Sequence, residues 1–237
     1  MNALLATAAQ AVPAAQSVTV SLGDLGNPEG MSTLMRIALV LTVLAVLPSI
    51  LVMFTCFVRL VIVFHFLRQA MGTQTTPPNQ VLTGLALIIT FFVMSPVAQQ
   101  VYDNALVPYQ NQQMDGETAL TEGLAPVKDW MLDNTRESDL ALFLRLSQSE
   151  RPATRDDVPL AALVPAFLIS ELKTAFQIGF LLFLPFLVID LVVSSVLLSM
   201  GMMMLPPVMI SFPFKILLFV MIDGWNLLIH SIMQSFR

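Results

Sequence analysis

Long runs of apolar residues alternate with short polar stretches along most of the chain. The first run, Ile37–Val58, lies between Arg36 and Arg59. As a helix it would be about 33 Å long at 1.5 Å per residue, enough to cross a bilayer core of about 30 Å. Pro48 is expected to interrupt this helix, because proline removes a backbone hydrogen bond. Leu60–Leu67 continues the pattern as a second piece.

Three further apolar runs follow. A loop with a double proline, Met71–Gln80, precedes the second run, Val81–Ala98. The third run, Leu160–Ser199, would be about 60 Å long as one helix, about twice the thickness of a bilayer core. A short loop with another double proline leads into the last run, Val208–Phe236. Both loops are expected to break the helices that they join.

Residues 99–159 differ from these runs, because they carry 11 acidic and 5 basic residues. Apolar side chains recur there at helical spacing at Leu120, Leu124, Val127 and Met131, and again at Leu140, Phe143 and Leu144. This periodicity predicts two short amphipathic helices. Their apolar faces are expected to pack on each other or on a neighbouring subunit.

The pattern predicts an all-α membrane protein in four segments. These are an N-terminal tail or signal remnant at 1–32, a hydrophobic helical hairpin at 33–98, an acidic helical segment at 99–159 and a second hydrophobic hairpin at 160–237. Four long helices are expected to be kinked, because prolines lie in or beside every apolar run. At the N-terminus, Ala9-Gln10-Ala11 resembles a signal-peptidase site without an upstream basic residue, and a signal remnant is slightly favoured over a tail.

Composition supports the membrane assignment. Hydrophobic residues make up 56% of the chain and charged residues 11%, whereas soluble domains carry roughly 25% charged residues. The formal net charge of −5 argues against a nucleic-acid partner. One cysteine, Cys56, excludes an intrachain disulfide, and the sequence has no zinc-type ligand cluster. No cofactor or metal is expected.

The distribution of basic residues predicts the topology. Arg59, His65 and Arg68 flank the loop before the second apolar run, which places that loop in the cytoplasm. The acidic segment, 99–159, then lies on the opposite side, the periplasm in a bacterium. The loop near residue 200 returns to the cytoplasmic side.

Five charged residues interrupt the apolar C-terminal half: Glu171, Lys173, Asp190, Lys215 and Asp223. Each would cost roughly 3 kcal/mol at the centre of a bilayer. We expect them to pair with one another, line an aqueous path or lie at subunit contacts. For Glu171, Lys173 and Asp223, a position at helix ends among the headgroups is equally compatible. Glu171 and Lys173 cannot form a same-face pair, because side chains two positions apart on a helix diverge.

Four methionines surround a glycine just before the second double proline: Met200, Met202, Met203 and Met204. Methionine is flexible and apolar, so it repacks easily around irregular neighbours. The glycine and the prolines disfavour a continuous helix here. The stretch is therefore either a deformable seal or a hydrophobic turn buried in a helix bundle, and its spacing alone favours the turn.

Ordered motifs spread over residues 33–234 closely resemble signatures of the flagellar FliP family and its type III secretion counterparts. They are RLVIVFHFLRQAMG (59–72), PPNQVL (77–82), TRESDLALF (135–143), SELKTAFQIG (170–179), PFLVIDLVV (185–193), MGMMM (200–204) and FPFKILLF (212–219). Long ordered motifs of this kind are specific to a family.

The resemblance implies a non-enzymatic pore subunit of the flagellar export gate, in the bacterial inner membrane within the flagellar basal body. It implies that about five copies assemble with related Q and R subunits into a helical closed cone, beside membrane lipid and other membrane proteins of the export apparatus. Its helices would form bent hairpins in a complex lifted largely out of the bilayer plane. Unfolded rod, hook and filament proteins would pass through the centre.

The resemblance also implies roles for individual residues. Met202, Met203 and Met204, with Met200 beside them, would form the gasket that closes the pore. Glu171, Lys173, Asp190 and Lys215 resemble the family's charged positions at subunit contacts. Trp130 and Phe143 are candidate assembly contacts, although ordinary core packing is the favoured interpretation for both.

The sequence leaves three alternative functions. A virulence-type injectisome subunit would share the same motifs. A proton-coupled small-solute transporter could use Asp190 and Glu171 as a relay, but such proteins show internal repeats, and the two halves of this sequence do not. An intramembrane hydrolase is disfavoured, because the sequence has neither a His-Glu-x-x-His motif nor a Gly-x-Ser-x-Gly elbow.

Overall fold

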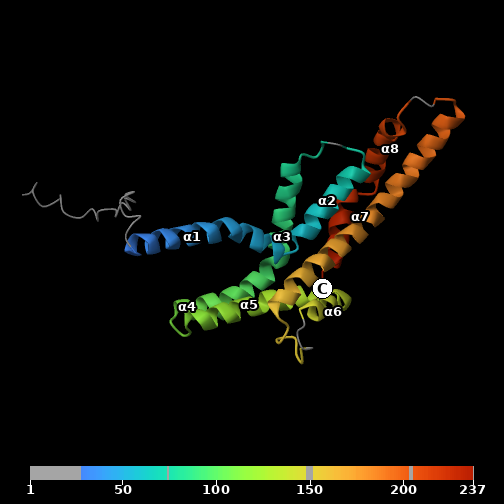
Figure 1. Ribbon diagram of the computed structural model, residues 1–237. Coiled ribbons are helices and arrows are strands. Elements are labelled where there is room, and N and C mark those ends of the chain that lie inside the picture. Colours follow the sequence, from blue (N-terminus) through green and yellow to red (C-terminus); the bar gives the residue numbers. More distant parts are fainter. Residues whose placement is uncertain (1–27, 74, 148–151, 203–204, 237) are drawn as a thin grey trace, which may run out of the picture. The chain divides into compact units, whose positions relative to one another are not determined.

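The computed structural model describes residues 28–73, 75–147, 152–202 and 205–236 (Figure 1). In chain order its elements are α1 (Pro28–Met53), α2 (Phe57–Ala70), α3 (Asn79–Val101), the π-helical turn η2 (Tyr102–Leu106), α4 (Val107–Gln110), α5 (Gly116–Asp133), α6 (Glu137–Leu146), α7 (Leu160–Ser199), α8 (Pro207–Met221) and α9 (Gly224–Gln234). The predicted all-α class is confirmed over these residues, which contain no strand.

The chain divides into two compact units, residues 1–48 and 49–237. Helix α1 continues through Pro48 and ends at Met53, so the predicted interruption at that proline is wrong. A proline inside an apolar helix is tolerated where small backbone adjustments satisfy the freed carbonyl. The break lies instead at residues 54–56, and α2 begins at Phe57.

A nearly continuous helical rod of 32 residues, Asn79–Gln110, is formed by α3, η2 and α4. Pro96 lies inside α3 without ending it, and the rod continues past Ala98, where the apolar run ends. Helix α5 folds back along this extension and packs against α3 and η2. A Cβ on Gly123 of α5 would lie 3.3 Å from the Cβ of Ala105. This close contact stabilises the rod beyond Ala98, where the apolar pattern of the sequence ends.

Helix α7 is continuous over 40 residues and contains both Pro165 and Pro185. The rod Asn79–Gln110 and α7 are long and apolar enough to cross a membrane. Helices α8 and α9 together would form a third span, bent by 66° at the break between them. The described residues thus provide two or three candidate spans, and α1 contributes a shorter apolar stretch, Met35–Val46.

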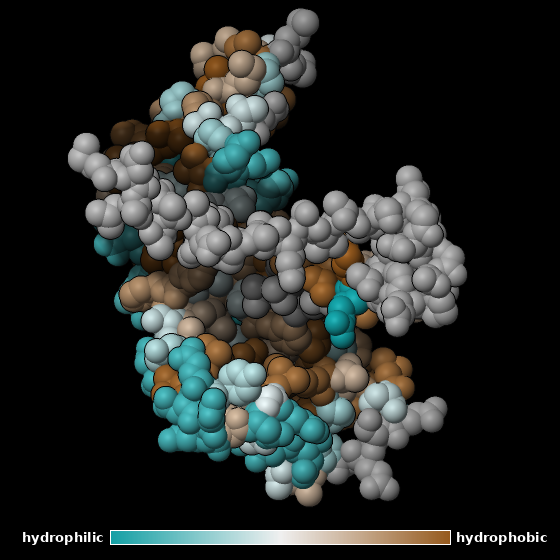
Figure 2. All heavy atoms as spheres, turned by 90° about the vertical axis from the view of Figure 1, so that its left-hand side faces the viewer, coloured by the Kyte–Doolittle hydropathy of each residue, from teal (hydrophilic) through white to brown (hydrophobic). Residues whose placement is uncertain are grey.

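Both predicted amphipathic helices are present as α5 and α6. Helix α5 packs against α3 and η2 and also touches α7, while α6 packs against α7. Met131 of α5 is fully buried, whereas Leu120 near the start of that helix is 66% exposed. Figure 2 shows hydrophilic side chains gathered at the end of the second unit where α4 and α5 lie.

The main core lies between α2 and α7, which run side by side (Figure 1). Leu60, Val63 and Phe64 of α2 are fully buried, as is Ala175 of α7. Small residues let the two helices approach: a Cβ on Gly179 would lie 2.5 Å from Cδ2 of Phe66. That distance is far shorter than van der Waals contact, so only glycine fits at this position without a shift of the aromatic ring.

We expect Gly179→Ala to destabilise the protein by about 1–3 kcal/mol, because the added methyl group overpacks the contact between α2 and α7. The apparent melting temperature of the detergent-extracted protein measures the loss. Gly84→Ala in α3 is the matched control, since nothing lies within 4 Å of its added Cβ. This change should be neutral or stabilising by up to about 1 kcal/mol. Equal losses from both substitutions would contradict the packing explanation.

Candidate functional site

Arg59 of α2 and Glu171 of α7 form an ion pair buried in the core. Their side chains are 2% and 1% exposed. The Arg59 Nε donates to Glu171 Oε2 at 2.9 Å, and Nη2 donates to Oε1, so the contact is bidentate. In an apolar setting each charge depends on the other for compensation. The pair therefore fixes the position of α2 along the axis of α7.

Arg59 also holds the residues that follow α9. Its Nη1 donates to the backbone oxygen of Ser235 at 3.0 Å and to Ser235 Oγ at 2.8 Å. The guanidinium carbon lies 4.2 Å from the ring centroid of Phe236, a cation–π contact. Trp130 of α5 packs against the same ring, with the two centroids 5.8 Å apart. One arginine thus joins α2, α7 and the end of α9, and Phe236 extends the junction to α5.

A second buried ion pair joins α7 to α8. Lys215 Nζ donates to Asp190 Oδ2 at 2.7 Å and to the backbone oxygen of Ala70 at 3.1 Å. Ser211 Oγ donates to Asp190 Oδ1 at 2.5 Å. The lysine side chain is 2% exposed and the aspartate side chain 27% exposed. The lysine is therefore the more deeply buried charge, and it depends on this aspartate.

A third ion pair ties α6 to α7 through Lys173 and Asp139. Ser170 Oγ donates to Asp139 Oδ2 at 2.9 Å and accepts the backbone N–H of Arg136 at 3.0 Å. Burial raises the pKa of Asp139, but the hydrogen bonds from Lys173 and Ser170 outweigh that effect and hold the pKa below its usual range. The carboxylate therefore stays charged and fixes the start of α6 against α7.

The four charged residues predicted at subunit contacts each have a partner within the chain. Glu171 and Lys173 face different partners, as their spacing on the helix predicted, and Asp190 and Lys215 pair with each other. Asp223 is exposed at the break between α8 and α9, and its position relative to the headgroups remains a prediction. A role of the four at subunit contacts remains a prediction.

Two partner residues, Arg59 and Asp139, were not among the predicted site residues. Arg59 flanks the predicted cytoplasmic loop in the sequence, but its side chain is buried, and the topology remains a prediction. Arg59 interrupts an apolar helix, so the signal that singled out Glu171 could have found it. Asp139 lies in a segment rich in acids, where no local pattern distinguishes it.

The methionine-rich stretch forms the turn that follows α7. Helix α7 ends at Ser199, and Gly201 adopts a left-handed conformation with φ of +73°. Met200 is 66% exposed and Met202 41% exposed. Met203 and Met204 lie outside the described residues. In a single chain, the described methionines of this turn are presented outward rather than buried in a bundle.

Trp130 and Phe143 occupy different environments. Trp130 is half-buried and packs against the main core and against a smaller buried cluster around Met131 and Phe167. Its indole Nε1 is buried without a hydrogen-bond partner in the described structure. Phe143 is half-buried on α6. Core packing accounts for Trp130 within one chain, and an assembly role for either residue remains a prediction.

Comparison with known proteins gives consistent matches. The model of the FliP family matches residues 40–232. The chain is 52% identical to the flagellar biosynthetic protein FliP of Bacillus subtilis (strain 168), covering 92% of this chain and 98% of that protein. It is 56% identical to the protein of that name from Pectobacterium carotovorum, over 83% and 76% of the two chains. The corresponding Caulobacter vibrioides protein is 48% identical, over 100% and 90%.

Proposed function

This chain belongs to the FliP family, and from that premise we propose that it is a pore-forming subunit of the flagellar export gate. Its relatives carry the name of flagellar biosynthetic proteins, which favours flagellar passengers over injected effectors. In this proposal, unfolded rod, hook and filament proteins cross the bacterial inner membrane through an assembly of several copies. The acidic segment, 99–159, faces the periplasm.

The exposed apolar surface of α7 carries the proposal. Phe180, Leu181 and Val188 are each more than half exposed in the single chain, as are Leu191 and Val192. The charges on the same helix already have partners inside the chain, through Arg59, Asp139 and Lys215. The outer surface of α7 is therefore suited to apolar contacts with further copies and with lipid.

The proposed partners follow from the family and from this surface. About five copies of the chain would pack together with related Q and R subunits, in a closed and helically arranged assembly. Other membrane proteins of the export apparatus and membrane lipid would surround it. No nucleic acid, cofactor or metal takes part, and the chain acts as a conduit rather than an enzyme. The ion pairs formed by Glu171, Lys173, Asp190 and Lys215 would lie at subunit contacts. Trp130 and Phe143 would be further assembly contacts.

The methionine turn supplies the proposed seal. Met200 and Met202 are exposed in the single chain, and Met203 and Met204 continue the stretch in the sequence. A ring of flexible apolar side chains excludes water and ions by dewetting. Because methionine repacks easily, the same ring can deform around an unfolded polypeptide.

Replacing Met200, Met202, Met203 and Met204 together with alanine should raise ion leakage through assembled complexes, because the seal loses bulk. Ion flux across the membrane of cells that carry the complex measures the leak. Met221→Ala is the matched control, since that methionine is 75% exposed at the opposite end of α8. Leakage equal to the unmodified protein, or equal leakage from the control, would contradict the seal.

Native mass spectrometry of the extracted complex, produced with its neighbouring membrane proteins, tests the assembly itself. A species with about five copies and bound smaller subunits supports the pore. A monomer or simple dimer under gentle extraction would overturn it and shift support to a transporter.

A further inference from the structure

Helices α8 and α9 meet at a sharp break rather than a continuous bend. Their axes differ by 66°, and the two residues between them are Ile222 and Asp223. Asp223 has φ of 50° and ψ of 54°, a left-handed conformation that residues other than glycine rarely adopt. A Cβ on Gly224 would lie 2.3 Å from the Phe219 ring. The break therefore combines a left-handed residue with a position that only glycine fits, and the chain changes direction within two residues.

Helix α9 is firmly attached to the rest of the second unit. Leu228 and Ile232 are 1% and 0% exposed. The residues just after the helix are held by Arg59, through the two hydrogen bonds to Ser235 and the contact with Phe236. Because Arg59 is itself fixed by its buried ion pair, this end of the hairpin has both apolar and polar anchors.

Helix α8 is attached differently. Its side-chain hydrogen bonds to other described elements all lie around one point, where Lys215 and Ser211 meet Asp190 and Lys215 also reaches the Ala70 oxygen. Most of its apolar side chains face outward, with Met209, Leu217 and Val220 among those at least 58% exposed. The side-chain polar contacts of α8 with α7 are thus concentrated at Asp190, which Lys215 and Ser211 both contact.

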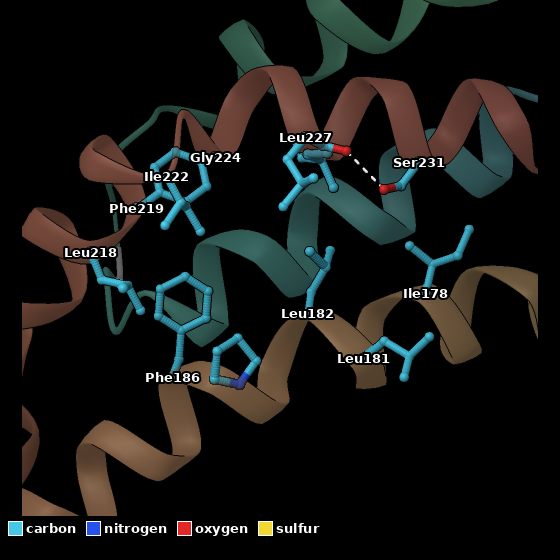
Figure 3. Close-up of a pocket in the computed structure, with 12 residues that line it drawn as sticks. Ile178, Leu181, Leu182, Phe186, Leu218, Phe219, Ile222, Gly224, Leu227 and Ser231 are labelled. Carbon is cyan, nitrogen blue, oxygen red and sulfur yellow. Dashed lines mark hydrogen bonds between the residues drawn. The ribbon is translucent and has the colours of Figure 1, made fainter.

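A cavity of about 350 Å³ lies beneath the break, between α7 and the bent pair. Figure 3 shows Leu182 and Phe186 of α7 and Leu227 of α9 around this space, with Gly224 at its edge. Phe186 and Phe219 line the cavity and pack on each other, with their ring centroids 6.4 Å apart. Phe219 in the last turn of α8 is 7% exposed, so this end of α8 is held against α7, while the adjacent cavity leaves room for the rest of α8 to change its angle.

We propose that α8 is a pivoting arm, hinged at Ile222–Asp223 and latched to α7 by the Asp190–Lys215 pair, while α9 is its fixed base. This inference rests on the proposed export-gate function, because the first residue of α8 follows the methionine turn. Opening of the latch swings that end of α8 and displaces the turn. At 15 residues, α8 is about 22 Å long, so a rotation of about 15° moves its far end by about 6 Å.

Distances between pairs of spin labels test the pivot in the full chain. Cys56 is the sole cysteine and is fully buried, so a Cys56→Ala background leaves only the introduced labels. The reporter pair is Leu198 on α7 and Met209 on α8, and the control pair is Phe180 on α7 and Asn226 on α9, all of them exposed. Dilution with unlabelled protein removes distances between neighbouring copies.

In the Asp190→Asn variant, the distance distribution of the reporter pair should broaden or shift by about 6 Å, whereas the control pair should be unchanged. Ser211→Ala, which removes one of the hydrogen bonds to Asp190, should give a smaller change and serves if Asp190→Asn fails to fold. An unchanged reporter pair, or equal changes in both pairs, would overturn the hinge. If the spin-label distance changes in Asp190→Asn but ion leakage does not, the hinge is supported and the methionine seal is rejected. The two proposals can therefore fail independently.

Discussion

Glu171→Ala should lower the apparent melting temperature of the detergent-extracted protein by about 10 °C. The substitution leaves the Arg59 guanidinium charged and unpaired in the core, where both side chains are at most 2% exposed. Removing one partner of a buried pair costs about 3–5 kcal/mol, and each kcal/mol corresponds to about 2–4 °C for a chain of this size. The loss should be large because Arg59 also anchors the residues that follow α9.

A surface ion pair provides the matched control for this prediction. Arg155 and Asp133 are paired, but their side chains are 60% and 48% exposed. Arg155→Ala should therefore change stability by less than about 1 kcal/mol, within a few degrees of the unmodified protein. The double substitution Arg59→Met and Glu171→Leu should recover part of the loss, since no charge is then left buried. A Glu171→Ala variant as stable as the Arg155→Ala variant would contradict a structural role for the buried pair.

Asp190→Ala should reduce the yield of assembled complex by more than about tenfold while expression of the chain falls much less. The change leaves Lys215, 2% exposed, without its counter-charge in an apolar setting, and a tenfold change in an equilibrium corresponds to about 1.4 kcal/mol. Lys215→Met should cost less, because Asp190 is 27% exposed and remains partly solvated. The amount of complex per expressed chain, measured on native gels, tests both substitutions.

The combination of Asp190→Asn with Lys215→Met separates charge pairing from proton transfer. If the pair is structural, this neutral combination should restore much of the assembly that either single change removes. Normal assembly of Asp190→Ala with loss of export would instead favour a proton relay through Asp190. A larger loss from Lys215→Met than from Asp190→Ala would contradict the inference that the lysine is the more dependent partner.

Much of the secondary structure could be predicted from local patterns. The two amphipathic helices of the acidic segment appear as α5 and α6, and the helix break at the methionine turn lies where Gly201 and the second double proline predicted it. The ends of helices were harder to predict: α1 passes through Pro48, and the rod that begins with α3 continues to Gln110. A proline is tolerated where other groups satisfy the freed carbonyl, and a polar helical extension is stabilised by packing that apolar periodicity does not report.

Composition, motif order and residue type are enough to predict the membrane class, the family and the presence of charges that need partners, because each of these is a local property of the chain. Which charges meet becomes visible only in the folded chain. Glu171 pairs with a residue 112 positions away, Lys173 with one 34 away and Asp190 with one 25 away. Such pairings depend on which helices lie side by side and on how far they are shifted along their axes. That arrangement is the outcome of packing over the whole core.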